Sequence, residues 1–228
     1  MKKITNYDIS KAKRCIFDFD GTLIPSANFW KKCDAEIIEN LYGIKTPDNE
    51  VVSLFYKSKS TEEYFEKVRT KYNICLSNQE FKFAEMIMAK KFYEQLEFIP
   101  NSDKALESLK HRQMPLTLAT RCPGFALDSF NNKTNFVSLY FNDIVTPKDV
   151  NGNVKKTQMY NLAFRRNDIR KTKTALAFED DLSGIKGANE AGATVVWVNC
   201  ADNGITPREQ KQIEQIAEFY LDDYKTIC

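Results

Sequence analysis

Short runs of largely apolar residues occur along the chain, and each of them ends in polar residues. The runs are Cys15–Phe17, Leu116–Ala119, Thr174–Phe178 and Thr194–Val198, with a shorter candidate at Ile144–Thr146. They are continuous instead of alternating with polar residues, as expected for strands that are covered on both faces. The pattern therefore predicts the strands of a buried parallel sheet.

Segments with helical periodicity separate the predicted strands. Three of them are Ser102–His111, Lys156–Arg166 and Asp181–Ala191. A fourth begins at the capping box Thr206–Glu209, which has proline at the first helical position. Its apolar residues at helical spacing are Ile213, Ile216, Ala217, Tyr220 and Leu221. Alternating strands and helices favour an α/β fold with a doubly wound, Rossmann-like parallel sheet.

Residues 26–98 interrupt this alternation, because they carry helical patterns only. One apolar stripe begins at Phe29, and the capping boxes Ser60–Glu63 and Ser77–Glu80 open two further helices. A helical block inserted after the first strand indicates a separate subdomain. We therefore expect an α/β core at 1–25 and 99–228, and a helical subdomain at 26–98.

The charges along the 228-residue chain are nearly balanced, with 33 basic and 31 acidic residues and a net charge of +2. This balance gives no reason to expect nucleic acid or an anionic membrane as a partner. No apolar run approaches the ~20 residues that span a bilayer, and no apolar leader follows the basic first residues, so we expect a cytoplasmic protein. The six cysteines form no CxxC pair and His111 is the only histidine, so we expect reduced thiols and no structural zinc site.

Polar residues gather where the predicted strands end, at the edge of an open α/β sheet where ligands bind. Asp18 and Asp20 follow the first strand, Thr120 the second and Asp180 a later one. Side chains at i and i+2 of a strand point the same way, so Asp18 and Asp20 repel each other unless a cation or a proton offsets their charge. Three carboxylates suit a hard ion with oxygen ligands, such as Mg²⁺, and an aspartate can accept a phosphoryl group.

Two adjacent lysines are candidates for binding a phosphate at this edge. Lys155 and Lys156 stand at the start of a predicted helix, whose N-terminal dipole also favours an anion. Each of them can equally be an ordinary solvated residue. We take Lys156 as the candidate, with Lys155 as the alternative.

These residues together resemble the haloacid dehalogenase (HAD) superfamily. Residues 18–23, DFDGTL, are similar to the first motif of that family, and Thr120 is similar to the second. Lys156 or Lys155 stands at the place of the third motif, and residues 178–185, FEDDLSGI, are similar to the fourth. The resemblance covers residues 14–24 and about 99–200.

The resemblance implies a reaction through an aspartyl-phosphate. Asp18 would attack the phosphorus atom, and Asp20 would protonate the leaving oxygen and later deprotonate the hydrolytic water. Mg²⁺ would be held by Asp18, by the backbone carbonyl of Asp20 and by Asp180, with Glu179 or Asp181 in support. The family's second aspartate, present here as Asp20, is typical of members that act on phosphate esters.

The resemblance also implies which residues bind the phosphate. Thr120 and Lys156 would bind the transferring group, and the tight turn at Gly21 would turn backbone N–H groups toward the same oxygens. Arg121 follows Thr120 where the family more often has a small or an amide residue, and we count it as a further phosphate-binding candidate.

The helical block at 26–98 resembles the family's small helical cap, which closes over the site, excludes water and selects the substrate. The prediction is a Mg²⁺-dependent phosphatase that acts on a small phosphorylated metabolite. One alternative is a sugar phosphomutase, although those members carry a histidine in the first cap helix and this chain has Trp30 near that place. The other is a catalytically silent protein that binds a partner. The substrate and the oligomeric state stay open.

Overall fold

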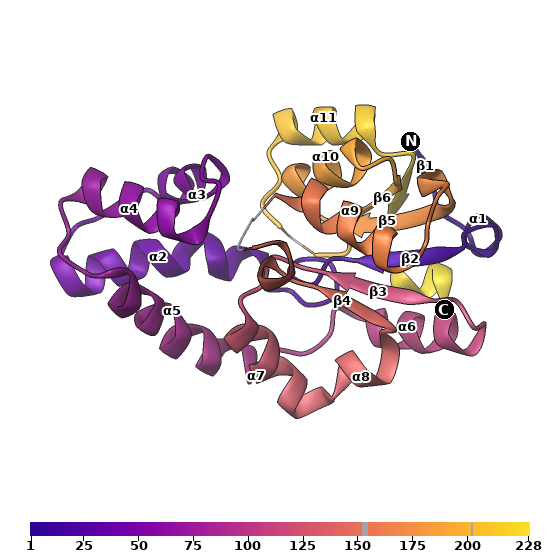
Figure 1. The fold of residues 1–228 in the computed structure, drawn as a ribbon, viewed down its shortest axis with the longest axis horizontal. Helices are drawn as coiled ribbons and strands as arrows, with labels where there is room; N and C mark the ends of the chain where they lie inside the picture. Colours follow the sequence, from indigo (N-terminus) through magenta and orange to yellow (C-terminus); the bar gives the residue numbers. More distant parts are fainter. Residues whose placement is uncertain (152–154, 202) are drawn as a thin grey trace.

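The computed structural model describes residues 1–151, 155–201 and 203–228. Its described residues form a seven-stranded sheet with the order β1-β7-β6-β5-β2-β3-β4, in which every neighbouring pair is parallel (Figure 1). The strands are β1 (Lys2–Lys3), β2 (Arg14–Phe17), β3 (Leu116–Ala119), β4 (Asp143–Val145), β5 (Ala175–Glu179), β6 (Thr194–Val198) and β7 (Phe219–Leu221). The predicted α/β fold with a doubly wound parallel sheet is confirmed.

Helices cover both faces of this sheet. Helices α6 (Ser102–His111), α7 (Gly124–Thr134) and α8 (Phe136–Tyr140) lie on one face, and α9 (Lys156–Arg166), α10 (Leu182–Glu190) and α11 (Pro207–Ile216) lie on the other (Figure 1). Neighbouring residues of β2 point to opposite faces, so Cys15 and Phe17 join one apolar core and Ile16 joins the other. Short helical segments complete the chain at α1 (Asn6–Ser10), Pro147–Val150, Thr172–Thr174 and Tyr224–Ile227.

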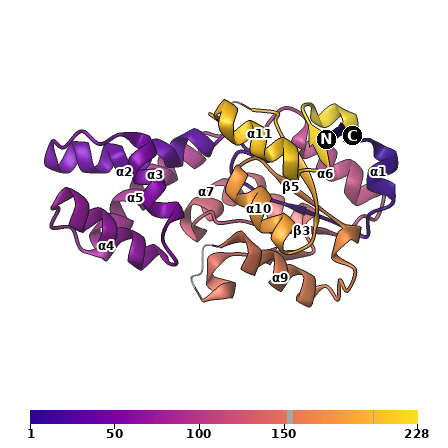
Figure 2. The ribbon, with the colours of Figure 1, turned by 90° about the horizontal axis from the view of Figure 1, so that it is seen from above.

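Between β2 and α6 the described chain has four helices and no strand: α2 (Ala27–Tyr42), α3 (Asp48–Tyr56), α4 (Thr61–Tyr72) and α5 (Asn78–Tyr93). These helices, called the insertion below, extend to one side of the sheet (Figure 2). They enclose an apolar cluster of their own, which includes Ile38, Phe65 and Phe81. The predicted capping residues Ser60 and Ser77 accept hydrogen bonds from the N–H groups of Glu63 and Glu80.

The last helix is shorter than the sequence pattern predicts. Helix α11 ends at Ile216, and Tyr220 and Leu221 belong to β7, which pairs with β6 and β1. Their spacing fits a helix, but backbone pairing with Trp197 and Val198 outweighs that local preference. The N-terminal strand β1, of two residues, completes this edge of the sheet.

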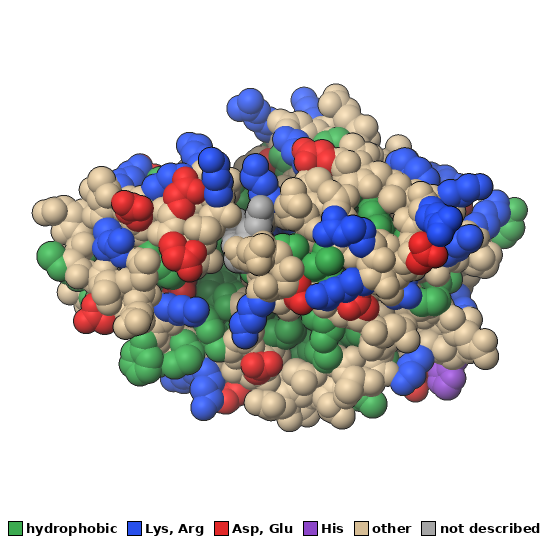
Figure 3. Space-filling view, viewed as in Figure 1, with side chains coloured by type: hydrophobic (Ala, Val, Ile, Leu, Met, Phe, Trp, Pro, Cys, Tyr) green, Lys and Arg blue, Asp and Glu red, His purple; other side chains and the backbone are tan. Residues whose placement is uncertain are grey.

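Charged side chains of both signs lie on the surface, in agreement with the near-neutral net charge. On the face drawn in Figure 3, basic side chains are scattered over the insertion and the α/β part, with acidic side chains among them. Among the described residues, no helix combines the length and the apolar character that crossing a bilayer requires.

Candidate active site

Three neighbouring strands, β5, β2 and β3, end at one edge of the sheet, and the residues at their ends carry most of the predicted site. The Asp18 N–H donates to the Phe178 carbonyl at 3.0 Å, which places Asp18 beside the end of β5. Glu179 is the last residue of β5, and Asp180 follows it. The side chains of Asp18, Glu179, Asp180 and Thr120 are all buried. The fold thus gathers residues that lie far apart in the sequence.

Asp18, Glu179 and Asp180, called the sheet-edge cluster below, each place one oxygen within 4.8 Å of the others. Burial, together with the charges of Asp181, Asp18 and Glu179, raises the pKa of Asp180 well above its usual value. Burial also raises the pKa of Glu179 to about 8, and its Oε2 atom has no hydrogen-bond partner among the described residues. A divalent cation relieves such crowding, and a set of oxygen donors at this spacing fits Mg²⁺.

Lys156 lies inside this cluster. Its Nζ atom is 2.7 Å from Asp18 Oδ1 and 2.8 Å from Glu179 Oε1, and it donates to the Ala119 carbonyl at 2.8 Å. Burial alone lowers the pKa of Lys156, but the carboxylates of Asp18 and Glu179 outweigh it and raise that pKa. Lys155 is exposed and precedes α9. The geometry therefore favours Lys156 over Lys155 as the lysine of the site.

Gly21 and Thr120 border the cluster. Gly21 has φ +74°, and a Cβ atom there would stand 2.1 Å from Asp180 Oδ2, so both the turn and the close approach require glycine. The Gly21 N–H donates to the Ile24 carbonyl at 2.8 Å. Thr120 Oγ1 accepts the Cys122 N–H at 2.9 Å, which leaves its hydroxyl proton for another acceptor.

The comparisons with known proteins identify this arrangement. Residues 15–198 match the family model described as haloacid dehalogenase-like hydrolase. The chain belongs to the haloacid dehalogenase-like hydrolases. This confirms the family that the sequence motifs resemble, and with it the predicted enzyme class, a phosphatase-like hydrolase.

Relatives of this HAD-like hydrolase include a probable pseudouridine-5′-phosphatase of Saccharomyces cerevisiae, which is 26% identical over 82% of this chain and 82% of its own length. Among solved structures, a variant of CbbY from Rhodobacter sphaeroides in complex with xylulose-1,5-bisphosphate has a TM-score of 0.72 at 18% identity and covers 93% of this chain and 95% of its own. The HAD-hydrolase YfnB from Bacillus subtilis, bound to magnesium, has a TM-score of 0.67 at 14% identity. The match covers 94% of this chain and 96% of YfnB.

In this HAD-like hydrolase, Arg121 lies beside Asp181. Arg121 Nη2 is 2.7 Å from Asp181 Oδ2, and its Nη1 donates to Ser183 Oγ at 3.0 Å. Asp181 also caps α10 by accepting the Gly184 N–H at 2.5 Å. From the insertion, the Tyr56 hydroxyl donates to Asp181 Oδ2 at 2.9 Å, and Arg121 lies 5.3 Å from the centre of the Tyr56 ring. These contacts join the insertion to the site.

The side chain of Asp20 contacts Ser26 and Tyr93. Its Oδ1 atom accepts hydrogen bonds from Ser26 Oγ at 2.5 Å and from the Tyr93 hydroxyl. Trp30 Nε1 donates to the same Tyr93 hydroxyl at 2.5 Å. The sequence pattern does not point to Ser26 or Tyr93 as site residues, and Trp30 stands out only as the residue near the place of the phosphomutase histidine. Tyr93 carries no local signal, because 73 positions separate it from Asp20.

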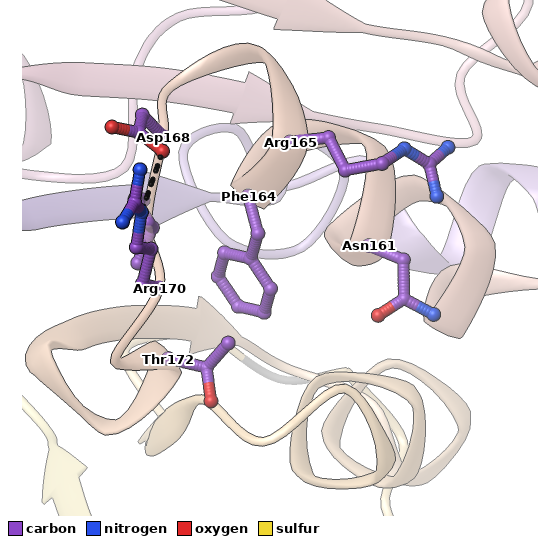
Figure 4. A pocket seen from close by; sticks show the side chains of 7 residues that line it. Asn161, Phe164, Arg165, Asp168, Arg170 and Thr172 are labelled. Atoms are coloured by element: carbon purple, nitrogen blue, oxygen red, sulfur yellow. Dashed lines mark hydrogen bonds and ion pairs between the residues drawn. The ribbon is translucent and has the colours of Figure 1, made fainter.

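A surface cavity of about 420 Å³ lies at the other end of α9 from Lys156, and it contains none of the predicted site residues (Figure 4). Its lining includes Arg165 and the ion pair between Asp168 and Arg170. The candidate active site is therefore the sheet edge and not this cavity.

Proposed function

We propose that this HAD-like hydrolase is a Mg²⁺-dependent phosphatase that hydrolyses a small phosphorylated metabolite through an aspartyl-phosphate. The observation that carries the proposal is the buried sheet-edge cluster with Lys156 among its carboxylates. Asp18 serves as the nucleophile, and Asp180 and Glu179 would help to hold the metal ion. Such a site suits phosphoryl transfer, in which positioning and electrostatic stabilisation do most of the catalysis.

Each side chain then has a role. The Asp18 carboxylate forms a bond to phosphorus as the bond from phosphorus to the leaving oxygen breaks, and Asp20 gives that oxygen its proton. Water then attacks the phosphorus atom, Asp20 takes a proton from it, and the Asp18 carboxylate is released. Asp18, Asp180 and the backbone carbonyl of Asp20, with Glu179 in support, would hold Mg²⁺, which when bound neutralises the phosphoryl oxygens.

The phosphate itself needs donors. Lys156 supplies a buried positive charge, and the Thr120 hydroxyl has a proton to donate. Arg121 is placed beside them and is a further candidate, and Gly21 allows the chain to turn close to the cluster. We also propose that residues 26–98 act as a cap over a core formed by 1–25 and 99–228, supported by the separate apolar cluster of the insertion and by its contact at Tyr56.

The test is phosphate release from a panel of phosphate esters, with Mg²⁺ and with a chelator. Pseudouridine 5′-phosphate is the first substrate to try, because a relative carries that name, and uridine 5′-phosphate and sugar phosphates follow. Removing the nucleophile in Asp18→Asn should abolish release, with a loss of about 10³-fold or more, and the chelator should do the same.

The matched control is Asp168→Asn, the same substitution at an exposed aspartate beside the remote cavity. It should release phosphate as the wild type does. Release that survives both Asp18→Asn and the chelator would contradict the proposal. Isomerisation of a hexose phosphate without release would favour the phosphomutase instead.

A further inference from the structure

A chain of partly buried hydrogen bonds connects Asp20 to both ends of the insertion. Trp30, in α2, donates its indole N–H to the Tyr93 hydroxyl, and that hydroxyl donates to Asp20 Oδ1. Tyr93 is the last residue of α5 and is fully buried. Helix α2 leaves the sheet after Asp20 and α5 leads back to it, so the bonds join the two helices at which the insertion meets the sheet.

Aromatic rings fix the position of the Tyr93 hydroxyl. The Tyr93 ring centre lies 6.3 Å from that of Phe19 and 6.0 Å from those of Phe29 and Trp30. Phe92 stacks on Phe29 at 4.2 Å, which closes the cluster. Because Trp30 occupies the acceptor side of the hydroxyl, the hydroxyl proton is directed to Asp20. A buried hydroxyl held on both sides has little freedom to reorient.

Ser26 and Tyr93 both donate to Asp20 Oδ1, and the Cys122 thiol also interacts with this carboxylate. Two donors on Oδ1 make Oδ2 the oxygen better suited to carry a proton to the leaving group. We propose that Tyr93 is a positioning residue for Asp20, through which the relative placement of α2 and α5 sets the geometry of the general acid. The inference rests on the proposed function, in which Asp20 protonates the leaving oxygen. It also connects that step to the insertion, since any shift between α2 and α5 moves the hydroxyl.

The test compares two substrates that differ in their need for an acid. The alkyl phosphate from the panel with the highest rate has a leaving oxygen that must be protonated, whereas p-nitrophenyl phosphate has a leaving group that departs as an anion. Tyr93→Phe should lower kcat/KM for the alkyl phosphate by about 10-fold to 100-fold, and for p-nitrophenyl phosphate by less than about 3-fold. The ratio kcat/KM is used because it reports phosphoryl transfer to Asp18 and not the later hydrolysis.

Two further variants show whether Tyr93 acts through Asp20. Asp20→Asn should give the same dependence on the leaving group, only larger, and adding Tyr93→Phe to it should cause no further loss. Trp30→Phe, which keeps an aromatic ring but removes the indole N–H, should show a weaker form of the Tyr93→Phe pattern.

The matched control is Tyr64→Phe, which removes another buried tyrosine hydroxyl that donates to a carboxylate of the insertion, Asp34. It should change the two substrates equally. An equal loss on both substrates in Tyr93→Phe, no loss on either, or an additional loss in the double variant would overturn the inference. A wild type that releases phosphate from neither substrate would instead contradict the proposed function, and the two failures are thus distinguished.

Discussion

Among the described residues, two groups of buried acids have different neighbours. The sheet-edge cluster of Asp18, Glu179 and Asp180 encloses the ammonium group of Lys156. The other group, called the insertion pair below, consists of Asp34 on α2 and Glu85 on α5, two buried carboxyl groups that interact electrostatically with each other. The Tyr64 hydroxyl from α4 also donates to Asp34.

The difference shows two ways to keep carboxyl groups inside a fold. Burial raises the pKa of Asp34 to about 6 and that of Glu85 well above its usual value, and exposed Lys82 opposes the shift of Glu85 only weakly. Burial raises the pKa of carboxyl groups in both places, but only the sheet-edge cluster has a buried cation, the Lys156 ammonium, within ion-pair distance of its carboxylates. The insertion pair is relieved by a proton, whereas the sheet-edge cluster is relieved by a fixed positive charge.

The largest effect is expected from removing the cation of the sheet-edge cluster. Lys156→Met keeps the length of the side chain but leaves Asp18 and Glu179 buried without their partner. The free energy of unfolding should fall by about 3–5 kcal/mol in urea titrations, and phosphate release should fall by about 10²-fold or more. Lys155→Met, at the exposed neighbour, should change stability by less than about 0.5 kcal/mol. Equal effects of the two variants would contradict the assignment of Lys156.

A smaller effect, visible only as a dependence on pH, is expected from the insertion pair. In the folded state Asp34 keeps its proton up to about pH 6, while the unfolded chain releases it near the ordinary value of 3.8. The folded state thus binds more protons between these values, and its stability contribution is lost as pH rises. Relative to wild type, Asp34→Asn should gain about 1–3 kcal/mol in unfolding free energy between pH 4 and pH 7.

The measurement is a urea titration at several pH values for both proteins. Asp8→Asn serves as the control of opposite sign, because hydrogen bonds from Thr5 and Lys2 lower the pKa of Asp8. Its stabilising contribution is present at neutral pH and is lost as pH falls. A difference between wild type and Asp34→Asn that stays constant with pH would show that the insertion pair is not protonated.

The smallest effect is expected at the contact that joins the two regions. Tyr56→Phe removes the hydrogen bond to Asp181 but keeps the ring beside Arg121. We expect KM to rise by about 2-fold to 5-fold with little change in kcat, since one partly exposed hydrogen bond contributes about 1 kcal/mol. Tyr42→Phe, which alters another exposed tyrosine of the insertion, should leave both constants unchanged. An unchanged KM in Tyr56→Phe would mean that this contact does not help to close the insertion over the site.

Much of the sheet could be predicted because its central strands are short apolar runs that end in polar residues. Leu116–Ala119 and Thr194–Val198 match β3 and β6, and the runs for β2 and β5 differ by one residue at their ends. The edge strand β1 and its neighbour β7 were not predicted, because two or three residues carry too little periodicity and Tyr220 also fits a helix. Their pairing is decided by the neighbouring strand.

The candidate site was predictable to the extent that it follows strand ends. Asp18, Glu179 and Asp180, which the motifs single out, lie close together at the ends of β2 and β5. Lys156 and Lys155 could not be separated by pattern, because only the packing of α9 against the sheet decides which of them is buried. Tyr93 was missed for a similar reason, since its bond to Asp20 depends on how α5 returns to the sheet.

The position of β2 in the sheet has a consequence for the order in which the protein forms. β2 is made early, yet its two neighbours are β3, which begins at Leu116, and β5, which begins at Ala175. A chain that has left the ribosome as far as Tyr93 contains all the insertion helices, with their sequence-local contacts, but neither strand between which β2 belongs. The insertion can therefore gain structure during synthesis, while Asp18 must wait until β5 has been made before it meets Asp180.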